Sequence, residues 1–464
     1  MIYQPQSEVY DEAFAPDGRV RPLYAELIGT LDRLELEALA EAVAAEAADR
    51  GVSFVLGGVE DTFTLDPVPR LIAADEWSLL ERGLAQRVRA LDRFVADAYT
   101  DQEIVATGVL PERALESCDH FEPRLVGLPA PPVHTAVAGL DVVRGAEGRF
   151  GVLEDNVRTP SGVAYTMAAR ECLDAHLPSW LADGRRSLDG AVELLARTLR
   201  SAAHEGVSDP SAVILTDGPE NSAWYEHQRL ARMLEIPIVT LDDLSVRAGR
   251  LEARTGRGRL RADVVYRRTD EDRLTDERGE LTDVGATLLE PIQNGTLTCV
   301  NALGAGVADD KLVHAYVENI VRFYLGEEPL LPSVRTYDPE VPEQRDEVLD
   351  RIDELVVKPR SGFGGQGVVV APHAEEDDVR AVAEAVHADP ASFVAQETVM
   401  ISTHPTVIGD HLEPRHVDLR PFVFLTGDEA KVVAGGLTRV ALDRGALVVN
   451  SSQRGGGKDT WVIS

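Results

Sequence analysis

The spacing of apolar residues predicts several amphipathic helices. Over residues 32–51 and 75–99 they recur every three or four positions, which places them on one face of a helix. The first of these segments ends on Gly51, and the second opens on Asp75, a residue type suited to cap a helix N-terminus. Further helices are expected over about 161–175, over 222–234, from about 309 onward and over 377–388.

Short β-branched runs predict strands between these helices. Residues 133–153 are interpreted as two strands around a tight turn at 145–148. The other expected strands lie at residues 211–216, 236–240, 262–268, 354–359, 367–372, 393–399, 416–425 and 446–450. Strands and helices alternate after residue 207, and this order is typical of a small parallel sheet.

The 464 residues are about three times the length of a typical domain, so more than one hydrophobic core is expected. We predict a mainly helical N-terminal region (1–116), a segment that carries an acidic motif (117–206), a βα segment (207–308) and a segment with a glycine-rich loop (309–464). Hydrophobic residues make up 44% of the chain, enough to exclude wholesale disorder.

The net charge of −33 argues against two classes of partner. An acidic chain repels nucleic-acid phosphates and anionic lipid surfaces, so neither nucleic acid nor a membrane is expected as a partner. The sequence has no apolar run long enough to span a bilayer and no signal-peptide pattern at its start. Its three cysteines are far apart, which predicts neither disulfides nor a zinc site. A cytoplasmic location is expected.

Lysine is scarce. Of 46 basic residues only four are lysine, namely Lys311, Lys358, Lys431 and Lys458. Adaptation of the surface to high salt would explain this scarcity, and so would a GC-rich codon bias. In either case a lysine that remains can do what arginine cannot, because its ammonium is a compact point charge on a flexible stem.

A glycine-rich segment follows Lys358 and reads KPRSGFGGQGVVV. Its glycines fit a dinucleotide-binding pattern, but a β-branched run follows them where that pattern requires a helix. A protein-kinase loop requires a lysine on the following strand, and the next lysine is Lys431. Two interpretations remain: a loop between two strands that covers phosphates, with Lys358 as a point charge, or a hairpin without a ligand.

An acidic motif lies about 200 residues earlier. Glu154 and Asn156 are two positions apart, so on a strand their side chains face the same way, and Asp141 lies one hairpin upstream. Two carboxylates and an amide offer the oxygen ligands that Mg²⁺ prefers. A solvated acidic hairpin is the alternative in a chain with 79 acidic residues.

Taken together and in this order, these motifs resemble a known family. The ExN motif, the Asp310-Lys311 pair, the strand with Lys358 before the glycines, and the Gln396-Glu397 pair are parts of ATP-grasp enzymes, in which ExN ordinarily comes last. The stretches LEDNVRTPSGVAY, ENSAWYEH, VDLRPFVF and VNSSQRGGGKDTW look very like the circularly permuted ATP-grasp type 2 family. The chain is also distantly similar to glutathionylspermidine synthetase-like ligases. The resemblance runs from about residue 70 to the C-terminus.

The resemblance implies an α+β or α/β chain with a circularly permuted ATP-grasp fold, a small parallel-sheet pre-ATP-grasp-like domain and a helical N-terminal region. It also implies ATP and Mg²⁺ as cofactors. By position, the metal ligands would be Asp141, Glu154 and Asn156. The residues around ATP would be Lys311, Lys358, Gly362, Gly364, Gly365, Gly367, Gln396 and Glu397.

The chain departs from the glutathionylspermidine-type relatives at one position. They carry an arginine two residues before the first metal aspartate, where this chain has Gly139. Transition-state charge would then have to come from Arg158, Arg420 or Arg439. Residues considered for substrate binding are Asn221 and Glu226 at a helix start, Arg267 and Arg268 at a strand end, and Lys458 near the C-terminus. These arginines could instead pair with the abundant acids.

The resemblance implies a carboxylate–amine ligase that forms a peptide-like bond through an acylphosphate. Its substrates would be a small-molecule or peptide carboxylate and an amine. A non-catalytic ATP-binding protein acting in a complex is the alternative, and phosphoryl transfer to another acceptor is a third. Relatives of this type are often encoded near alpha-E and transglutaminase-like proteins, so such a protein partner is plausible.

Overall fold

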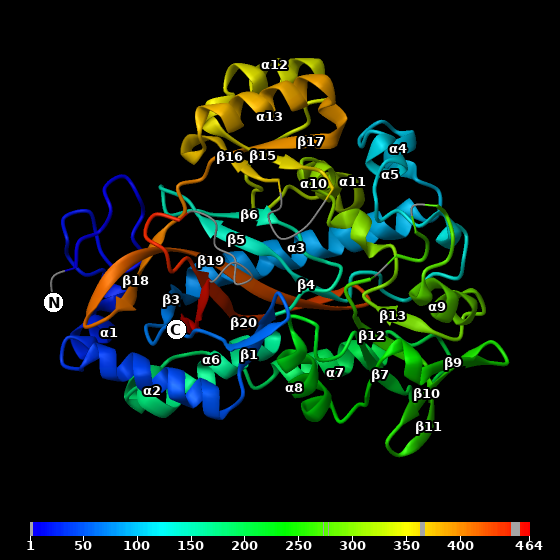
Figure 1. Cartoon of the computed structure of the whole chain (residues 1–464), viewed down its shortest axis with the longest axis horizontal. Coiled ribbons are helices and arrows are strands. Elements are labelled where there is room, and N and C mark those ends of the chain that lie inside the picture. The colour runs from blue at the N-terminus through cyan, green and yellow to red at the C-terminus, as the bar shows by residue number, and fades with distance from the viewer. Residues whose placement is uncertain (1–2, 272, 277, 362–366, 447–454) are drawn as a thin grey trace.

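A computed structural model describes residues 3–271, 273–276, 278–361, 367–446 and 455–464. It combines helices with six β-sheets among these residues (Figure 1). The sequence predictions at 446–450 and at Gly362, Gly364 and Gly365 therefore fall largely or wholly outside the described residues. Among the described residues, no helix combines the length and apolarity needed to cross a bilayer.

The largest sheet joins two distant parts of the chain. Strands β4 (Val137–Gly139), β5 (Asp141–Arg144) and β6 (Phe150–Glu154) come from one part. Strands β18 (Thr403–Ile408), β19 (His411–Thr426), β20 (Glu429–Val440) and β21 (Gly456–Lys458) come from the other. All seven strands are antiparallel to their neighbours, and the long strand β19 pairs with both groups. The predicted hairpin at 133–153 is thus built into a sheet with residues about 270 positions later.

Helices cover this sheet. The helix α3 (Ala74–Ala98) packs against β19 and β20, α6 (Val163–His176) packs against β20, and α7 (Ala191–Ser201) packs against β19. Trp77, Leu84 and Phe94 of α3 are fully buried, as expected for its apolar face. The helix predicted over 75–99 therefore lies within a residue of its observed bounds.

A parallel sheet occupies the βα part of the sequence. Its order is β13 (Thr298–Val300), β12 (Val264–Arg268), β7 (Ala212–Thr216) and β8 (Ile238–Val239). Helices α8 (Trp224–Leu234) and α9 (Asp283–Gln293) belong to it, and β9 (Leu244–Arg247), β10 (Arg250–Thr255) and β11 (Gly258–Ala262) form an antiparallel sheet beside it. The predicted rhythm after residue 207 is present.

Residues 336–397 form a small lobe at the top of Figure 1. Its sheet has the order β14 (Thr336–Tyr337), β17 (Phe393–Glu397), β15 (Leu355–Pro359) and β16 (Val369–Val370), and helices α12 (Pro342–Asp350) and α13 (Glu376–Ala388) belong to the same lobe. Val357 of β15 faces Val369 of β16 in an antiparallel pair. The prediction that the glycine-rich segment joins two strands is confirmed.

One prediction of secondary structure was incomplete and another was wrong. Helices make up most of the regular structure in the N-terminal 116 residues, but this region also contains β1 (Ser53–Leu56), β2 (Val59–Thr62) and β3 (Arg70–Ala73). Strand β3 runs parallel to β22 (Thr460–Ile463), a partner that local sequence cannot reveal. The helix expected from about 309 is divided into α10 (Lys311–His314) and α11 (Val317–Leu325), because Tyr316 leaves the helical conformation.

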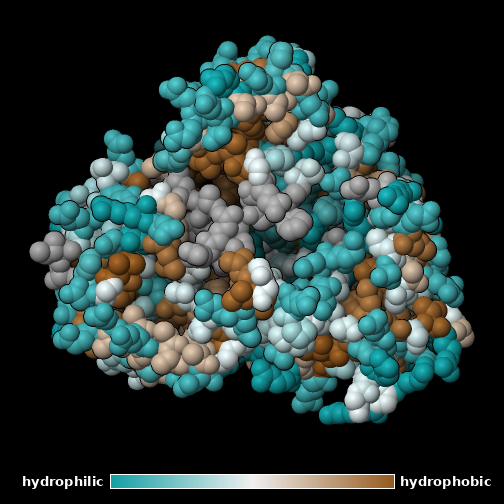
Figure 2. Space-filling view, in the orientation of Figure 1, coloured by the Kyte–Doolittle hydropathy of each residue, from teal (hydrophilic) through white to brown (hydrophobic). Residues whose placement is uncertain are grey.

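The remaining helices are short or lie at the N-terminus. They are η1 (Pro22–Tyr24), α1 (Ala25–Leu31), α2 (Leu36–Asp49), α4 (Glu103–Ala106), α5 (Arg113–Glu116), η2 (Pro123–Leu125), η3 (Ser179–Ala182), η4 (Leu241–Asp243), η5 (Ala305–Ala308), η6 (Ile352–Glu354), η7 (Ala371–His373) and η8 (Pro390–Ser392). The surface in Figure 2 is mostly hydrophilic and is hollowed beneath the small lobe, where apolar residues form the upper wall.

Candidate active site

Glu154, the last residue of β6, is followed by Asp155 and Asn156, and these three neighbouring residues differ in their contacts. Asp155 is fully buried and accepts hydrogen bonds from Arg87 Nε and Nη2 at 2.6 and 2.7 Å, while His314 Nδ1 lies 2.7 Å from its Oδ2. Burial alone would raise the pKa of Asp155, but Arg87 and His314 hold it well below its usual range. Strand β6 ends at Glu154, and Asp155 anchors the chain directly after it, between Glu154 and Asn156.

Glu154 and Asn156 offer oxygen ligands to a cation. Asn156 Nδ2 is buried without a hydrogen-bond partner. A 180° rotation of the side-chain amide would place its oxygen where this nitrogen lies, so the amide has unused capacity for a ligand. Glu154 lies directly opposite Asp141 on β5. Among the described residues, no group of three or more His, Cys, Asp or Glu side chains is arranged to hold a metal. Of the three predicted ligands, Glu154 and Asn156 carry oxygen donors of the kind that Mg²⁺ prefers.

Asp141 is engaged by arginines. Arg420 Nε and Nη2 donate to its two oxygens at 2.7 and 2.9 Å, and Arg439 Nη2 lies 2.8 Å from Oδ2. Burial would raise its pKa, but the two arginines hold the pKa of Asp141 below its ordinary value. Arg439 also donates to Asp418, so two arginines and two aspartates form one cluster, in which Arg420 is the partly exposed member. In this arrangement Asp141 orients cations of the protein, and a metal would have to share its oxygens with them.

The structure explains the glycine at position 139. A Cβ atom there would lie 2.9 Å from Pro160 Cβ and 3.3 Å from Arg420 Cδ, closer than ordinary contacts. Gly139 on β4 pairs with Phe422 on β19, so Arg420, two residues away on β19, occupies this neighbourhood. The position that carries an arginine in the glutathionylspermidine-type relatives is therefore approached by an arginine from the adjacent strand.

Two lysines from the other part of the chain face the acidic motif. Lys358 on β15 donates from Nζ to Gln396 Oε1 at 2.6 Å, and Lys311 Nζ donates to the Arg360 carbonyl at 3.3 Å. Burial lowers the pKa of Lys358, Lys311 lowers it further, and Glu154 opposes them. Gln396 Nε2 also reaches the Leu153 carbonyl of β6 at 3.3 Å. Strands β6, β15 and β17 are thus joined around a site with two ammonium groups and a carboxylate.

Glu397 and Gly367, also predicted near ATP, lie at opposite ends of β15, because Glu397 pairs with Leu355 and Gly367 lies against Pro359. Glu397 accepts two hydrogen bonds from Arg351, both at 3.0 Å, and one from Tyr337 Oη at 2.5 Å. Arg351 holds the pKa of Glu397 below its ordinary value. Gly367 has a φ of +70°, and a Cβ there would lie 2.8 Å from Pro359 Cγ. A glycine is therefore required where the chain enters β16.

Most residues predicted to bind substrate belong to an internal network. Glu226 Oε2 accepts from the backbone of Gly162 and Ala164 at 2.9 Å, and Oε1 accepts from Arg268 Nη2 at 3.1 Å. Glu226 therefore occupies the N-terminus of α6 with its own carboxylate. Asn221 Nδ2 donates to Asp217 and Asp270 at 3.0 and 3.2 Å. This network fixes the parallel sheet against the segment after the acidic motif.

Arg267, Arg158 and Lys458 have three different placements. Arg267 is 2% exposed and alternates with Arg268 along β12, so the two side chains leave opposite faces of the strand. Arg158 Nη1 lies 2.5 Å from His120 Nε2, and its Nε lies 3.8 Å from Asp309. Lys458 is fully buried, bonded to Asp66 and donates to the Pro405 carbonyl at 3.0 Å. The ammonium of Lys458 is thus engaged by an internal carboxylate and a backbone carbonyl, apart from the contacts of Lys311 and Lys358.

Sequence reasoning missed Arg87, His314 and Arg360. Arg87 and His314 anchor Asp155, and Arg360 pairs with Asp310. No local pattern distinguishes Arg87 from its neighbours on α3. Arg360 did have a signal, since it directly follows the Lys358-Pro359 pair.

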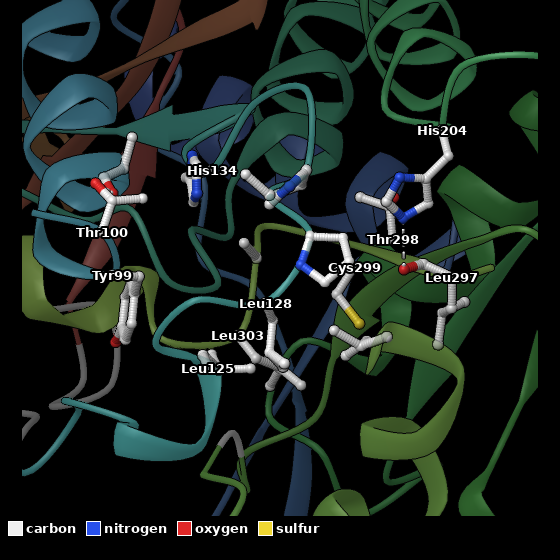
Figure 3. Close-up of a pocket in the computed structure, with 16 residues that line it drawn as sticks. Tyr99, Thr100, Leu125, Leu128, His134, His204, Leu297, Thr298, Cys299 and Leu303 are labelled. Carbon is white, nitrogen blue, oxygen red and sulfur yellow. Dashed lines mark hydrogen bonds between the residues drawn. The ribbon is translucent and has the colours of Figure 1, made fainter. Parts of the chain in front are cut away.

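A separate pocket lies at the edge of the parallel sheet (Figure 3). Tyr99 and Thr100 at the end of α3 line one side, and Thr298 and Cys299 of β13 line another. Burial lowers the pKa of His134 in its wall, and burial raises the pKa of Cys299 to about 11. None of the site residues predicted from the sequence lines this pocket.

The fold and these motifs define a class of protein. Residues 69–441 match the family described as "Circularly permuted ATP-grasp type 2", and the chain belongs to this family. At the level of fold, it is similar to a glutathione synthetase-like effector from Globodera pallida, with a TM-score of 0.61, 12% identity, and coverage of 92% of this chain and 97% of that one.

Two relatives of similar length are named as uncharacterized proteins. The chain is 44% identical to an uncharacterized protein of Mycobacterium leprae over 99% of this chain and 83% of that protein. It is 41% identical to an uncharacterized protein of Synechocystis, over 99% and 98% of the two chains. A third relative, from Frankia casuarinae, is named "Putative glutamate--cysteine ligase 2-2" and is 44% identical over 99% of this chain, which spans 54% of that protein.

Proposed function

We propose that this protein is an ATP- and Mg²⁺-dependent ligase that joins a carboxylate to an amine through an acylphosphate. One observation carries the proposal. Lys358 of the small lobe donates to Gln396 at 2.6 Å, and Gln396 donates to the carbonyl of Leu153 at 3.3 Å, so Lys358 is tied to the strand that ends at Glu154, about 200 residues earlier in sequence. Two ammonium groups opposite oxygen ligands for Mg²⁺ form a site for a polyphosphate.

Each group has a chemical task in this proposal. Bound Mg²⁺ would neutralise charge on the phosphate oxygens, held by Glu154 and Asn156. Lys311 and Lys358 would bind those oxygens as point charges, and Gln396 orients Lys358 through its 2.6 Å hydrogen bond. Arg420, fixed by Asp141, would stabilise the charge that develops on the reacting carboxylate. The glycine-rich segment would exclude water, which otherwise hydrolyses an acylphosphate.

Membership of the ATP-grasp family supports the ligase class. The Frankia name supports it less, because this chain spans 54% of that protein and the name describes the whole. Substrates and any alpha-E or transglutaminase-like partner remain part of the proposal.

The test is ADP release with Mg²⁺ in the presence of pooled amino acids, short peptides and polyamines, with Lys358→Ala as the blank. The proposal predicts release that depends on both a carboxylate and Lys358, with a new product mass and an acyl hydroxamate when hydroxylamine replaces the amine. ATP binding without stimulated release would favour the non-catalytic alternative. Stimulated release without a hydroxamate would favour phosphoryl transfer to another acceptor.

A further inference from the structure

The Arg360 side chain connects its own segment, which follows Lys358, to residues 113–117 and to Asp310, which precedes Lys311. Its Nε donates to both oxygens of Asp310 at 2.9 and 3.0 Å, and Nη1 donates to Ser117 Oγ at 2.6 Å. Its Nη2 donates to the carbonyls of Arg113 and Ala114 at 3.1 and 3.2 Å. All three guanidinium nitrogens are used, and the side chain is 6% exposed.

The contacts of Arg360 form a closed circuit with Lys311. Asp310 caps α10 by accepting from the Leu312 backbone at 2.8 Å, which fixes the start of the helix that carries Lys311. Lys311 Nζ returns to the carbonyl of Arg360 at 3.3 Å. Lys358 is two residues before Arg360 on the same chain segment. Arg360 thus joins the two segments that carry Lys311 and Lys358. Its side chain binds Asp310, and its carbonyl accepts from Lys311.

The preceding residue extends this circuit to the acidic motif. Asp309 Oδ1 accepts from the Val157 backbone at 2.5 Å, one residue after Asn156. Three successive residues therefore have three different contacts. Asp309 contacts the backbone next to Asn156, Asp310 contacts the Arg360 side chain, and Lys311 contacts the Arg360 carbonyl. An arginine suits this place because its planar guanidinium directs several donors at once, whereas lysine cannot reproduce that geometry.

We propose that Arg360 is a positioning residue that sets the spacing between Lys311 and Lys358, and so the fit of the site to nucleotide phosphates. This role rests on the proposed function. A buried pair of this kind contributes mainly to placement, because much of its Coulomb energy is offset by desolvation.

The four lysines of the chain allow a direct test without turnover. Trace acetylation with acetic anhydride, read by mass spectrometry, is compared between the wild type and Arg360→Gln. Lys431, with a side chain 49% exposed, is the reference, and fully buried Lys458 reports an intact fold. We expect acetylation of Lys311 relative to Lys431 to rise at least about fivefold in the variant, while Lys458 stays protected.

Acetylation of Lys311 within about twofold of wild type, with Lys458 still protected, would show that Arg360 does not hold Lys311 and would overturn the proposal. A parallel rise at Lys458 would show a general loss of structure, and the second variant then decides, because unchanged acetylation of Lys311 in that variant would overturn the proposal as well. Arg360→Lys is the second variant, in case the first does not fold. It keeps a cation for Asp310 and loses the fork of contacts, so an intermediate rise at Lys311 is expected. Arg380→Gln is the matched control, since Arg380 pairs with Asp377 on the surface of the same lobe.

Nucleotide measurements separate this proposal from the proposed function. In Arg360→Gln we expect ADP release to slow at least about tenfold while ADP affinity stays within about threefold, because misplaced lysines affect the reacting phosphate most. Equal losses of affinity and rate would contradict a positioning role. If the wild type binds no nucleotide, the proposed function fails, and the acetylation result still decides whether Arg360 spaces the lysines.

Discussion

Two lysines, Lys358 half-buried and Lys458 fully buried, illustrate how similar residues come to differ in role. Lys358 on β15 and Lys458 on β21 both have a pKa lowered by burial. The direct partner of Lys458 is the Asp66 carboxylate, which opposes that effect. The direct partner of Lys358 is the neutral amide of Gln396, and the neighbouring Lys311 lowers its pKa further.

The difference shows which lysine remains able to bind an anion. A buried cation paired with a carboxylate is neutralised within the protein. Lys358 donates to a neutral amide, and the carboxylates of Glu154 and Asp141 act on it together with the cation of Lys311. We infer that its charge is balanced less completely than that of Lys458, which leaves a field that attracts a phosphate. We therefore propose that the region of Lys358 serves ligand binding and that the region of Lys458 serves stability.

The largest expected effect is on activity at Lys358. Lys358→Met should slow Mg²⁺-dependent ADP release by about 10²- to 10³-fold, because a preorganised charge next to the transferred phosphoryl group is lost. The free energy of unfolding, measured in urea, should stay the same or rise, since an expensive burial of charge is removed. A variant that keeps wild-type turnover would place the chemistry elsewhere.

The counterpart at Lys458 should affect stability. Lys458→Met leaves Asp66 buried without its cation, so the free energy of unfolding should fall by about 3–5 kcal/mol. Urea denaturation measures this change, and Lys458→Met combined with Asp66→Asn should recover part of it. A loss below about 1 kcal/mol would mean that the pair contributes little beyond hydrophobic packing.

A third buried base, His227, extends the comparison to pH. Burial and Arg268 lower its pKa to about 2, so it stays neutral in the folded protein while the unfolded chain takes up a proton below about pH 6.5. Its contribution to stability is complete above that pH and is lost as the pH falls, with a slope of up to about 1.4 kcal/mol per pH unit. His227→Gln should reduce the loss of stability between pH 7 and pH 5, and exposed His411→Gln should not.

The smallest effect is expected at Lys431. Its side chain is 49% exposed and pairs with Glu429 on the surface, so Lys431→Ala should change the free energy of unfolding by less than about 0.5 kcal/mol. ADP release should be unchanged. A large effect on either quantity would show that exposure does not separate the lysines as argued.

Local pattern predicted the elements whose partners lie close in sequence. The helix over 75–99 and the βα rhythm after 207 follow from apolar spacing, and α3 confirms the first within a residue. The ExN motif and Lys358 were found because strand alternation and lysine scarcity are visible in sequence. That these two motifs lie together was expected only from the family resemblance, because local sequence pattern does not predict contacts between residues about 200 positions apart.

What could not be predicted depends on distant partners. Lys458 was considered for substrate binding because its partner Asp66 lies 392 positions away in sequence, where local pattern cannot reveal the pairing. Glu226 and Arg268 looked like ligand groups at a sheet edge, and each instead satisfies the other and the start of α6. The pairing of β3 with β22 was missed for the same reason.

The most direct test of the account is calorimetric binding of ATP, with Mg²⁺ and with EDTA, to the wild type, Lys358→Met and Lys431→Ala. The account predicts Mg²⁺-dependent binding that weakens at least about tenfold in Lys358→Met and is unchanged in Lys431→Ala. Equal affinity in all three proteins, or binding indifferent to Mg²⁺, would contradict the claim that Lys358 and the acidic motif form one nucleotide site.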